Sequence, residues 1–164
     1  MIPQHAIREW RAVAPWAEPF QVEQDLVITR ALIQIYLDPY LAREFALRGG
    51  TATQKLFFEK PIRYSEDIDL VQLRGGPIGP ALDALRKQLD PWLGAPRRSR
   101  KEDRFTLIYH YESEFPPVQP MRLKIEVNNG ENFTVFDLQK RDLEARSLWF
   151  SGKAEVQTYL IEEL

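Results

Sequence analysis

The sequence contains no cysteine and only two histidines among its 164 residues. A chain without thiols forms no disulfide, offers no thiolate nucleophile and binds no metal through sulfur. Any metal would therefore be held by oxygen ligands or by His5 and His110, which points to hard cations such as Mg²⁺.

Long apolar runs and an excess of positive charge are also missing. No segment approaches the roughly 20 apolar residues of a membrane-spanning helix, and the N-terminal sequence MIPQHAIREW lacks the basic and then apolar order of a signal peptide. We therefore expect a cytoplasmic protein with no membrane partner. The net charge of -2 gives no overall attraction to nucleic acid, so an RNA or DNA partner would need a local basic patch.

What is present is the composition of a globular protein, with 44% hydrophobic and 28% charged residues. The length favours a single domain over residues 1–164. An N-terminal helical segment of about residues 1–44 precedes a sheet core of about residues 45–150. Helices mixed with four or more strands predict an α/β or α+β domain.

This prediction rests on the strands and helices that we expect in individual segments. We expect strands at residues 45–48, 67–73, 105–113 and 121–129, with weaker candidates at 133–138 and 147–150. We expect helices at residues 5–14, 22–38, 51–58 and 80–93. Thr51 is placed to cap the third of these helices. Residues 97–104, RRSRKEDR, are expected to form a polar connection.

The sequence DIDL at residues 67–70 alternates acidic with apolar residues. Alternate residues of a strand share a face, so Asp67 and Asp69 point the same way while Ile68 and Leu70 point into the core. Two carboxylates about 5 Å apart repel by roughly 3 kcal/mol at an effective dielectric near 20, a cost that a bound divalent cation offsets. A surface ion-pair arrangement is the alternative explanation of the same pattern.

The segment MRLKIEV at residues 121–127 supplies a third carboxylate. Glu126 lies on the polar face of a predicted strand and is the natural third ligand for Mg²⁺ or Mn²⁺. Lys124 shares that face. Its ammonium could neutralise phosphate charge or could simply be solvated.

The sequence RGGT at residues 48–51 lies between a predicted strand and a predicted helix. Amides at a helix N-terminus bind anions, and glycine permits close approach, so Gly49 and Gly50 are candidates for a phosphate site. A tight turn without a ligand is the simpler alternative. A phosphate turn, an acidic pair and a third acid beside a lysine together indicate a nucleoside triphosphate with its metal ions.

The sequence FALRGGTATQKLFFEKPIRYSEDIDLV resembles the nucleotidyltransferases of the AbiEii/AbiGii toxin family, a branch of the polymerase β-like nucleotidyltransferase superfamily. The superfamily pattern of two glycines, a helix and Asp-hydrophobic-Asp is matched by Gly49, Gly50, Asp67 and Asp69. The later sequence RLKIEV matches the strand that carries the third carboxylate. The resemblance covers most of the chain from about residue 40 onward.

This resemblance implies a nucleotidyltransferase fold, with a mixed sheet flanked by helices, and a set of site residues. Asp67, Asp69 and Glu126 would be catalytic and would hold two Mg²⁺ or Mn²⁺ ions. Arg63 and Ser65 match an Arg-x-Ser pattern of this branch. The expected nucleotide-binding residues are Gly49, Gly50, Thr51, Arg63, Ser65 and Lys124.

The implied activity is transfer of a nucleoside monophosphate from a nucleoside triphosphate (NTP) to an acceptor such as tRNA, with release of pyrophosphate. The protein would be the toxin of an abortive-infection type toxin-antitoxin pair, with a cognate antitoxin as partner. Family members continue into a C-terminal helical region, and we expect residues 158–164 to be the start of that region in a truncated chain. The alternatives are a non-catalytic binding module, which associates with an antitoxin or with itself, and a protein adenylyltransferase.

A cluster of positive charge follows the predicted helix at residues 80–93. The cations could contact an RNA backbone, because each neutralised phosphate adds affinity, although a solvated loop is the simpler alternative. They are Arg97, Arg98, Arg100, Lys101 and Arg104.

Overall fold

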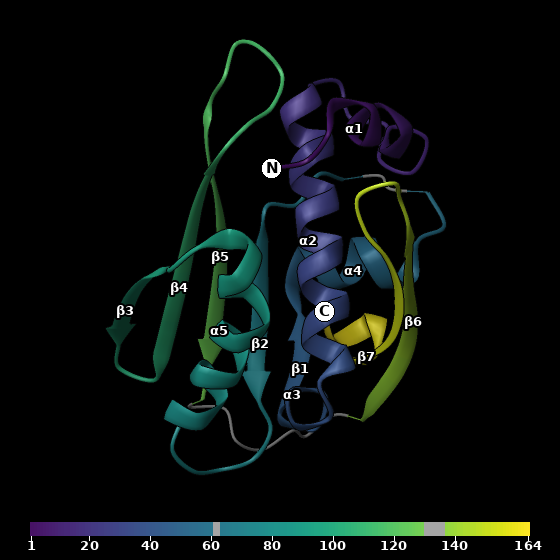
Figure 1. Cartoon of the computed structure of the whole chain (residues 1–164). Helices are drawn as coiled ribbons and strands as arrows, with labels where there is room; N and C mark the ends of the chain where they lie inside the picture. The colour runs from purple at the N-terminus through teal and green to yellow at the C-terminus, as the bar shows by residue number, and fades with distance from the viewer. Residues whose placement is uncertain (61–62, 130–136) are drawn as a thin grey trace.

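The computed structural model describes residues 1–60, 63–129 and 137–164 (Figure 1). The described strands form one seven-stranded sheet in the order β3-β4-β5-β2-β1-β7-β6. β2 pairs with β5, and β1 with β7, in parallel, whereas the other neighbours are antiparallel, so the sheet is mixed as predicted. The strands are β1 (Phe45–Arg48), β2 (Asp67–Gln72), β3 (Arg97–Lys101), β4 (Arg104–Glu112), β5 (Pro120–Asn128), β6 (Leu138–Arg146) and β7 (Ser151–Tyr159).

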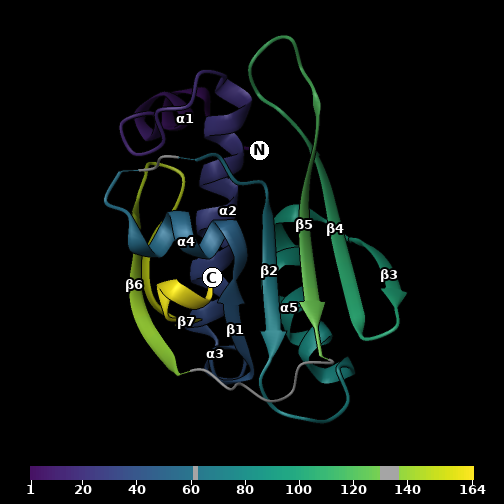
Figure 2. The ribbon, with the colours of Figure 1, turned by 180° about the vertical axis from the view of Figure 1, so that it is seen from behind.

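Helices cover both faces of this sheet. α2 and α5 lie on one face, and α4 lies on the other, as the two opposite views show (Figures 1 and 2). None of the described helices combines the length and the apolar character that crossing a lipid bilayer requires. The helices are α1 (Gln4–Trp10), α2 (Pro19–Leu37), α3 (Pro39–Glu44), α4 (Gly49–Phe57), α5 (Gly79–Leu93) and the 3-10 helix η1 (Ile161–Glu163).

The main core lies between the sheet and the layer formed by α2 and α5. Leu26 and Ile33 of α2 are fully buried and share one cluster of side chains with Ile68 and Ile125 of the central strands. The helical stripe of α5 is buried against the same cluster, as its spacing predicts. Its members are Leu82, Leu85, Leu89 and Leu93.

A buried amide of α2 connects the beginning of β2 to β5. Gln24 donates from Nε2 to the carbonyl oxygens of Glu66 and Arg122, at 3.0 Å each. Its Oε1 accepts a hydrogen bond from the hydroxyl of Tyr111. Because a buried amide is costly unless its groups are paired, Gln24 favours one alignment of β2 on β5.

Residues 97–101 form strand β3 rather than the polar connection that we expected. β3 pairs with β4 in antiparallel register, from Arg97 opposite Ile108 to Lys101 opposite Arg104. All five side chains of β3 are exposed. The prediction failed because a charged edge strand carries no apolar alternation, although such a strand is a common end to a sheet.

The C-terminal part contains two long strands, β6 and β7, which the sequence pattern did not reveal. The predicted strand at residues 147–150 is wrong, because these residues form the turn between β6 and β7, where the Ser147 amide donates to the Phe150 carbonyl at 3.1 Å. In the weaker candidate at 133–138, residues 133–136 lie outside the described residues. The sheet continues to Tyr159, and η1 follows where we expected a longer helix to begin.

Asp25 and Lys55 form a buried ion pair between α2 and α4. Lys55 Nζ lies 2.5 Å from Asp25 Oδ1, and the two side chains are only 8% and 4% exposed. The indole nitrogens of Trp10 and Trp16 also donate to this carboxylate, at 2.9 and 3.4 Å. Burial alone would raise the pKa of Asp25, but the charge of Lys55 and these donors hold it below its ordinary value.

We expect Lys55→Met to lower the free energy of unfolding by about 3 kcal/mol, because it leaves Asp25 buried without its cation. The double variant Asp25→Asn/Lys55→Met should lose less free energy of unfolding than Lys55→Met alone, since it removes both buried charges. Urea denaturation at neutral pH, followed by circular dichroism, measures both losses. A double variant that loses as much stability as Lys55→Met, or more, would contradict the coupling.

The same ion pair predicts a dependence of stability on pH. The pKa of Asp25 is lower in the folded chain than the value of about 3.9 in an unfolded chain. The contribution of the ionised Asp25 to the free energy of unfolding is therefore complete above the unfolded pKa, and it is lost as the pH falls through the folded pKa. Urea titrations below about pH 4 should show a steeper loss of stability for the natural sequence than for the double variant. Equal slopes would reject this assignment.

Candidate active site

Asp67 and Asp69 lie at the start of β2, on the face of the sheet that points away from α2 and α5. Both are partly exposed, whereas Ile68 and Leu70 between and after them are buried. The alternation predicted from the sequence is therefore present. It places the two carboxylates on one side of the strand.

Glu126 and Lys124 of β5 stand directly beside this acidic pair. In the parallel register of β2 and β5, Asp67 is opposite Lys124 and Asp69 is opposite Glu126. Laterally paired residues of neighbouring strands share a face. The sheet thus brings together the three carboxylates and the lysine that the sequence singled out.

The negative charges on this face act on one another. Burial raises the pKa of Asp69, and the carboxylates of Glu126 and Asp67 raise it further, against the opposing charges of Arg48 and Lys124. Burial is the largest cause of this raised pKa, and repulsion from the two neighbouring carboxylates adds to it. This is the electrostatic condition under which a divalent cation is favourable.

Glu126 also has two cationic neighbours. Arg104 Nε lies 3.2 Å from Glu126 Oε1, and Lys124 Nζ lies 3.4 Å from Oε2. With the side chains in these positions, no group of three Asp, Glu or His residues within residues 1–60, 63–129 and 137–164 is arranged to hold one metal ion. The oxygen donors suit Mg²⁺ or Mn²⁺, and Glu126 would have to turn from its ion pairs to join the two aspartates.

The glycine turn, formed by Gly49 and Gly50, packs against Asp69. Gly49 has φ +82°, and a Cβ atom added there would lie 2.8 Å from Asp69 Oδ2. Only glycine satisfies both the positive φ and this close approach. A Cβ on Gly50 would meet only Ser65 Oγ, at 3.8 Å, which is an ordinary contact. The turn therefore brings the N-terminus of α4 directly to the acidic pair.

Thr51 and Ser65 hold the first turn of α4 on the start of β2. Their hydroxyl oxygens are 2.5 Å apart, and the Thr51 hydroxyl donates to the carbonyl oxygen of Asp67. The prediction that Thr51 caps the helix is wrong, because α4 begins at Gly49 with Arg48 as its N-cap. Arg63 is exposed, and the structure brings it into no described contact with the acidic pair.

Two arginines of the site were missed by the sequence analysis. Arg48 is opposite Asp69 in the β1–β2 register, and its charge opposes the rise in the pKa of Asp69. Arg104 was noted only as part of a basic connection, although it pairs with Glu126. Arg48 could have been found, since it immediately precedes the glycine turn. Arg104 could not, because its position depends on the β4–β5 register.

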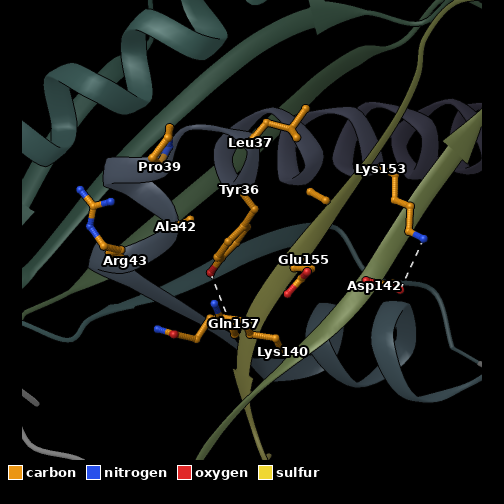
Figure 3. A pocket seen from close by; sticks show the side chains of 11 residues that line it. Tyr36, Leu37, Pro39, Ala42, Arg43, Lys140, Asp142, Lys153, Glu155 and Gln157 are labelled. Atoms are coloured by element: carbon orange, nitrogen blue, oxygen red, sulfur yellow. Dashed lines mark hydrogen bonds and ion pairs between the residues drawn. The ribbon is translucent and has the colours of Figure 1, made fainter.

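A separate cavity of about 650 Å³ lies between α2, α3 and the strands β6 and β7 (Figure 3). Its wall includes Tyr36, whose hydroxyl donates to the carbonyl oxygens of Phe45 and Gln157, at 3.1 and 3.4 Å. An ion pair between Lys153 and Asp142 closes another part of the wall. None of the predicted site residues lines this cavity.

Comparison with solved structures places this fold among known proteins. JHP933 from Helicobacter pylori is similar with a TM-score of 0.54 at 12% identity, over 89% of this chain and 54% of that protein. A second H. pylori protein, described as a "putative nucleotidyltransferase", is similar with a TM-score of 0.54 at 14% identity, over 89% of this chain and 56% of its own. The chain thus spans about half the length of these two proteins. No curated protein matches it.

The family is established by a match that extends through the site. The model described as "Nucleotidyl transferase AbiEii toxin, Type IV TA system" matches residues 30–164. This range includes the glycine turn, the acidic pair and the strand that carries Glu126. The chain therefore belongs to the AbiEii nucleotidyl transferase toxin family of type IV toxin-antitoxin systems.

Proposed function

We propose that this protein transfers a nucleoside monophosphate from an NTP to an acceptor hydroxyl, as the toxin of a toxin-antitoxin pair. The observation that carries the proposal is the contact between Gly49 and Asp69, with Glu126 beside Asp69 on the next strand. The helix start that would bind the phosphates is thereby placed directly against the acidic pair. Family membership supports the same activity.

The nucleotide phosphates would lie at the N-terminus of α4. Amides at Gly49 and Gly50 and the positive end of the helix dipole attract anions. Lys124 and Arg48 add positive charge on the same face of the sheet. Thr51 and Ser65 would act by holding the turn in place, and Arg63 would reach the phosphates from the exposed segment before β2.

Asp67, Asp69 and Glu126 would hold Mg²⁺ or Mn²⁺ in this reaction. Such ions, when bound, neutralise phosphate charge and lower the pKa of an attacking hydroxyl. The raised pKa of Asp69 and the oxygen character of all three ligands support this assignment. Glu126 would exchange its contacts with Arg104 and Lys124 for the metal.

The transfer itself is an in-line displacement. The oxygen of the acceptor hydroxyl forms a bond to the α-phosphorus, and the bond from that phosphorus to the oxygen bridging the β-phosphate breaks. Pyrophosphate leaves, and the proton of the hydroxyl passes to solvent. A tRNA end is the proposed acceptor, and a cognate antitoxin is the proposed protein partner. A protein side chain as acceptor would give the same bond changes.

A non-catalytic binding module is the second candidate function. The observation that favours it is that Glu126 is already paired with Arg104 and Lys124. Isothermal titration with an NTP, in the presence and absence of Mg²⁺, separates the two candidates. A transferase should show metal-dependent binding, whereas a binding module should show none.

Substituting the acidic pair tests the catalytic assignment. We expect Asp67→Asn and Asp69→Asn each to reduce transfer of labelled nucleotide to tRNA by at least about 100-fold, because each removes a metal ligand. Asp83→Asn is the matched control, since Asp83 is exposed on α5, which covers the opposite face. Transfer that survives in both site variants would reject the metal assignment.

Gly49→Ala tests the contact between the turn and the acidic pair. The added methyl group would displace the Asp69 carboxylate, since the Cβ position is 2.8 Å from Oδ2. We expect transfer to fall by at least about tenfold, in keeping with a displaced catalytic group. Gly94→Ala is the control, because Gly94 has nearly the same φ, +81°, with nothing within 4 Å of an added Cβ.

Both glycine variants should lose about 1–3 kcal/mol of stability from backbone strain, which thermal denaturation measures. Transfer is then compared at a temperature where both are folded. Equal effects of the two substitutions on transfer would show that the approach of Gly49 to Asp69 has no catalytic role.

A further inference from the structure

One half of the sheet has a face that no described helix covers. In Figure 2, α4 lies in front of the sheet beside β1 and β6, while β3, β4 and β5 have no described helix in front of them. β4 turns Phe105, Leu107 and Tyr109 toward the core. Its alternate residues therefore lie on the uncovered face.

The strand registers gather cations on that face from the three strands β3, β4 and β5. Arg97 of β3 is opposite Ile108 of β4, which is opposite Lys124 of β5. In the same way Lys101 is opposite Arg104, and Arg122 is opposite His110. We call this surface the basic face. Its cations are Arg97, Lys101, Arg104, Arg122 and Lys124.

The basic face leads to the acidic pair. Lys124 is opposite Asp67 in the β2–β5 register, so Arg97, Ile108, Lys124 and Asp67 form one row across four strands. Neighbouring strands are about 4.8 Å apart, which puts the backbones of Arg97 and Asp67 roughly 14 Å from each other. A ligand of a few phosphates could span this distance.

The positive charge is local, because the whole chain has a net charge of -2. On β3, β4 and β5, two acids share the face with these cations. Glu126 is already neutralised by Arg104 and Lys124, and Glu112 lies at the far end of β4. The turn between β3 and β4 adds Glu102 and Asp103 at the edge of the sheet. The centre of the face therefore remains positive.

We propose that the basic face binds the phosphate backbone of an RNA acceptor and directs its end to Asp67 and Asp69. The catalytic part of this inference rests on the proposed transferase function. The face offers little apolar surface, since Ile108 is its main aliphatic side chain and is half-buried. Protein partners usually need an apolar or aromatic centre, whereas a polyphosphate needs spaced cations.

The alternation of β3 provides a matched pair of variants. Arg98 and Arg100 are opposite Leu107 and Phe105, so they lie on the other side of the strand from Arg97 and Lys101. Arg100 contacts the Phe105 ring at 5.0 Å. Each double substitution, Arg97→Gln/Lys101→Gln or Arg98→Gln/Arg100→Gln, removes two positive charges from the same five-residue strand.

The experiment measures binding of a short, fluorescein-labelled single-stranded RNA by fluorescence anisotropy, over a range of salt concentrations. No NTP is present, so binding is measured without transfer. We expect Arg97→Gln/Lys101→Gln to weaken binding at least about fivefold and to reduce the slope of log affinity against log salt by about 1.4. Arg98→Gln/Arg100→Gln should change affinity less than about twofold. Thermal denaturation shows that both variants are folded.

Equal effects of the two double variants, or no effect of either, would overturn the proposal. Displacement of the labelled RNA by an unlabelled glutamate-rich peptide would also overturn it, because the face would then favour an acidic protein over RNA. Transfer to RNA with an unchanged KM in Arg97→Gln/Lys101→Gln would reject the basic face and leave the transferase intact. The expected binding pattern in a protein that transfers no nucleotide would support the basic face and reject the proposed function.

Discussion

The site depends on the parallel pairing of β2 with β5. This pairing sets Asp69 beside Glu126 and Asp67 beside Lys124. A shift of one residue would turn the acidic pair toward the core, because side chains alternate along a strand. Gln24 opposes such a shift, since its buried amide donates at once to Arg122 of β5 and to Glu66, the residue before β2. The geometry of the acidic surface is thus fixed partly from the opposite face of the sheet.

The features that could be predicted from the sequence are those with a local physical cause. The alternation of DIDLVQ shows a strand with one apolar face, and the leucine spacing of α5 shows an amphipathic helix. The glycine turn is equally local, because the positive φ of Gly49 suits glycine alone. Glu126 was expected beside the aspartates from its polar strand face and from the family resemblance, and the β2–β5 register sets it opposite Asp69.

The features that could not be predicted depend on distant partners. β3 consists of polar residues and is a strand only because β4 pairs with it. β6 and β7 also depend on each other, since their nine residues pair along the whole length of both strands. Their sequences have no apolar pattern that marks where each strand begins and ends. The ion pair of Arg104 with Glu126 arises from the β4–β5 register, which no short stretch of sequence encodes.

The double role of Arg104 has a consequence for the order of events at the site. Its guanidinium pairs with Glu126, and it is also one of the cations of the basic face. A single guanidinium cannot fully satisfy a carboxylate and an arriving phosphodiester together. An incoming nucleic acid would therefore compete with Glu126 for Arg104, and Lys124 would remain as the other cationic neighbour of that carboxylate.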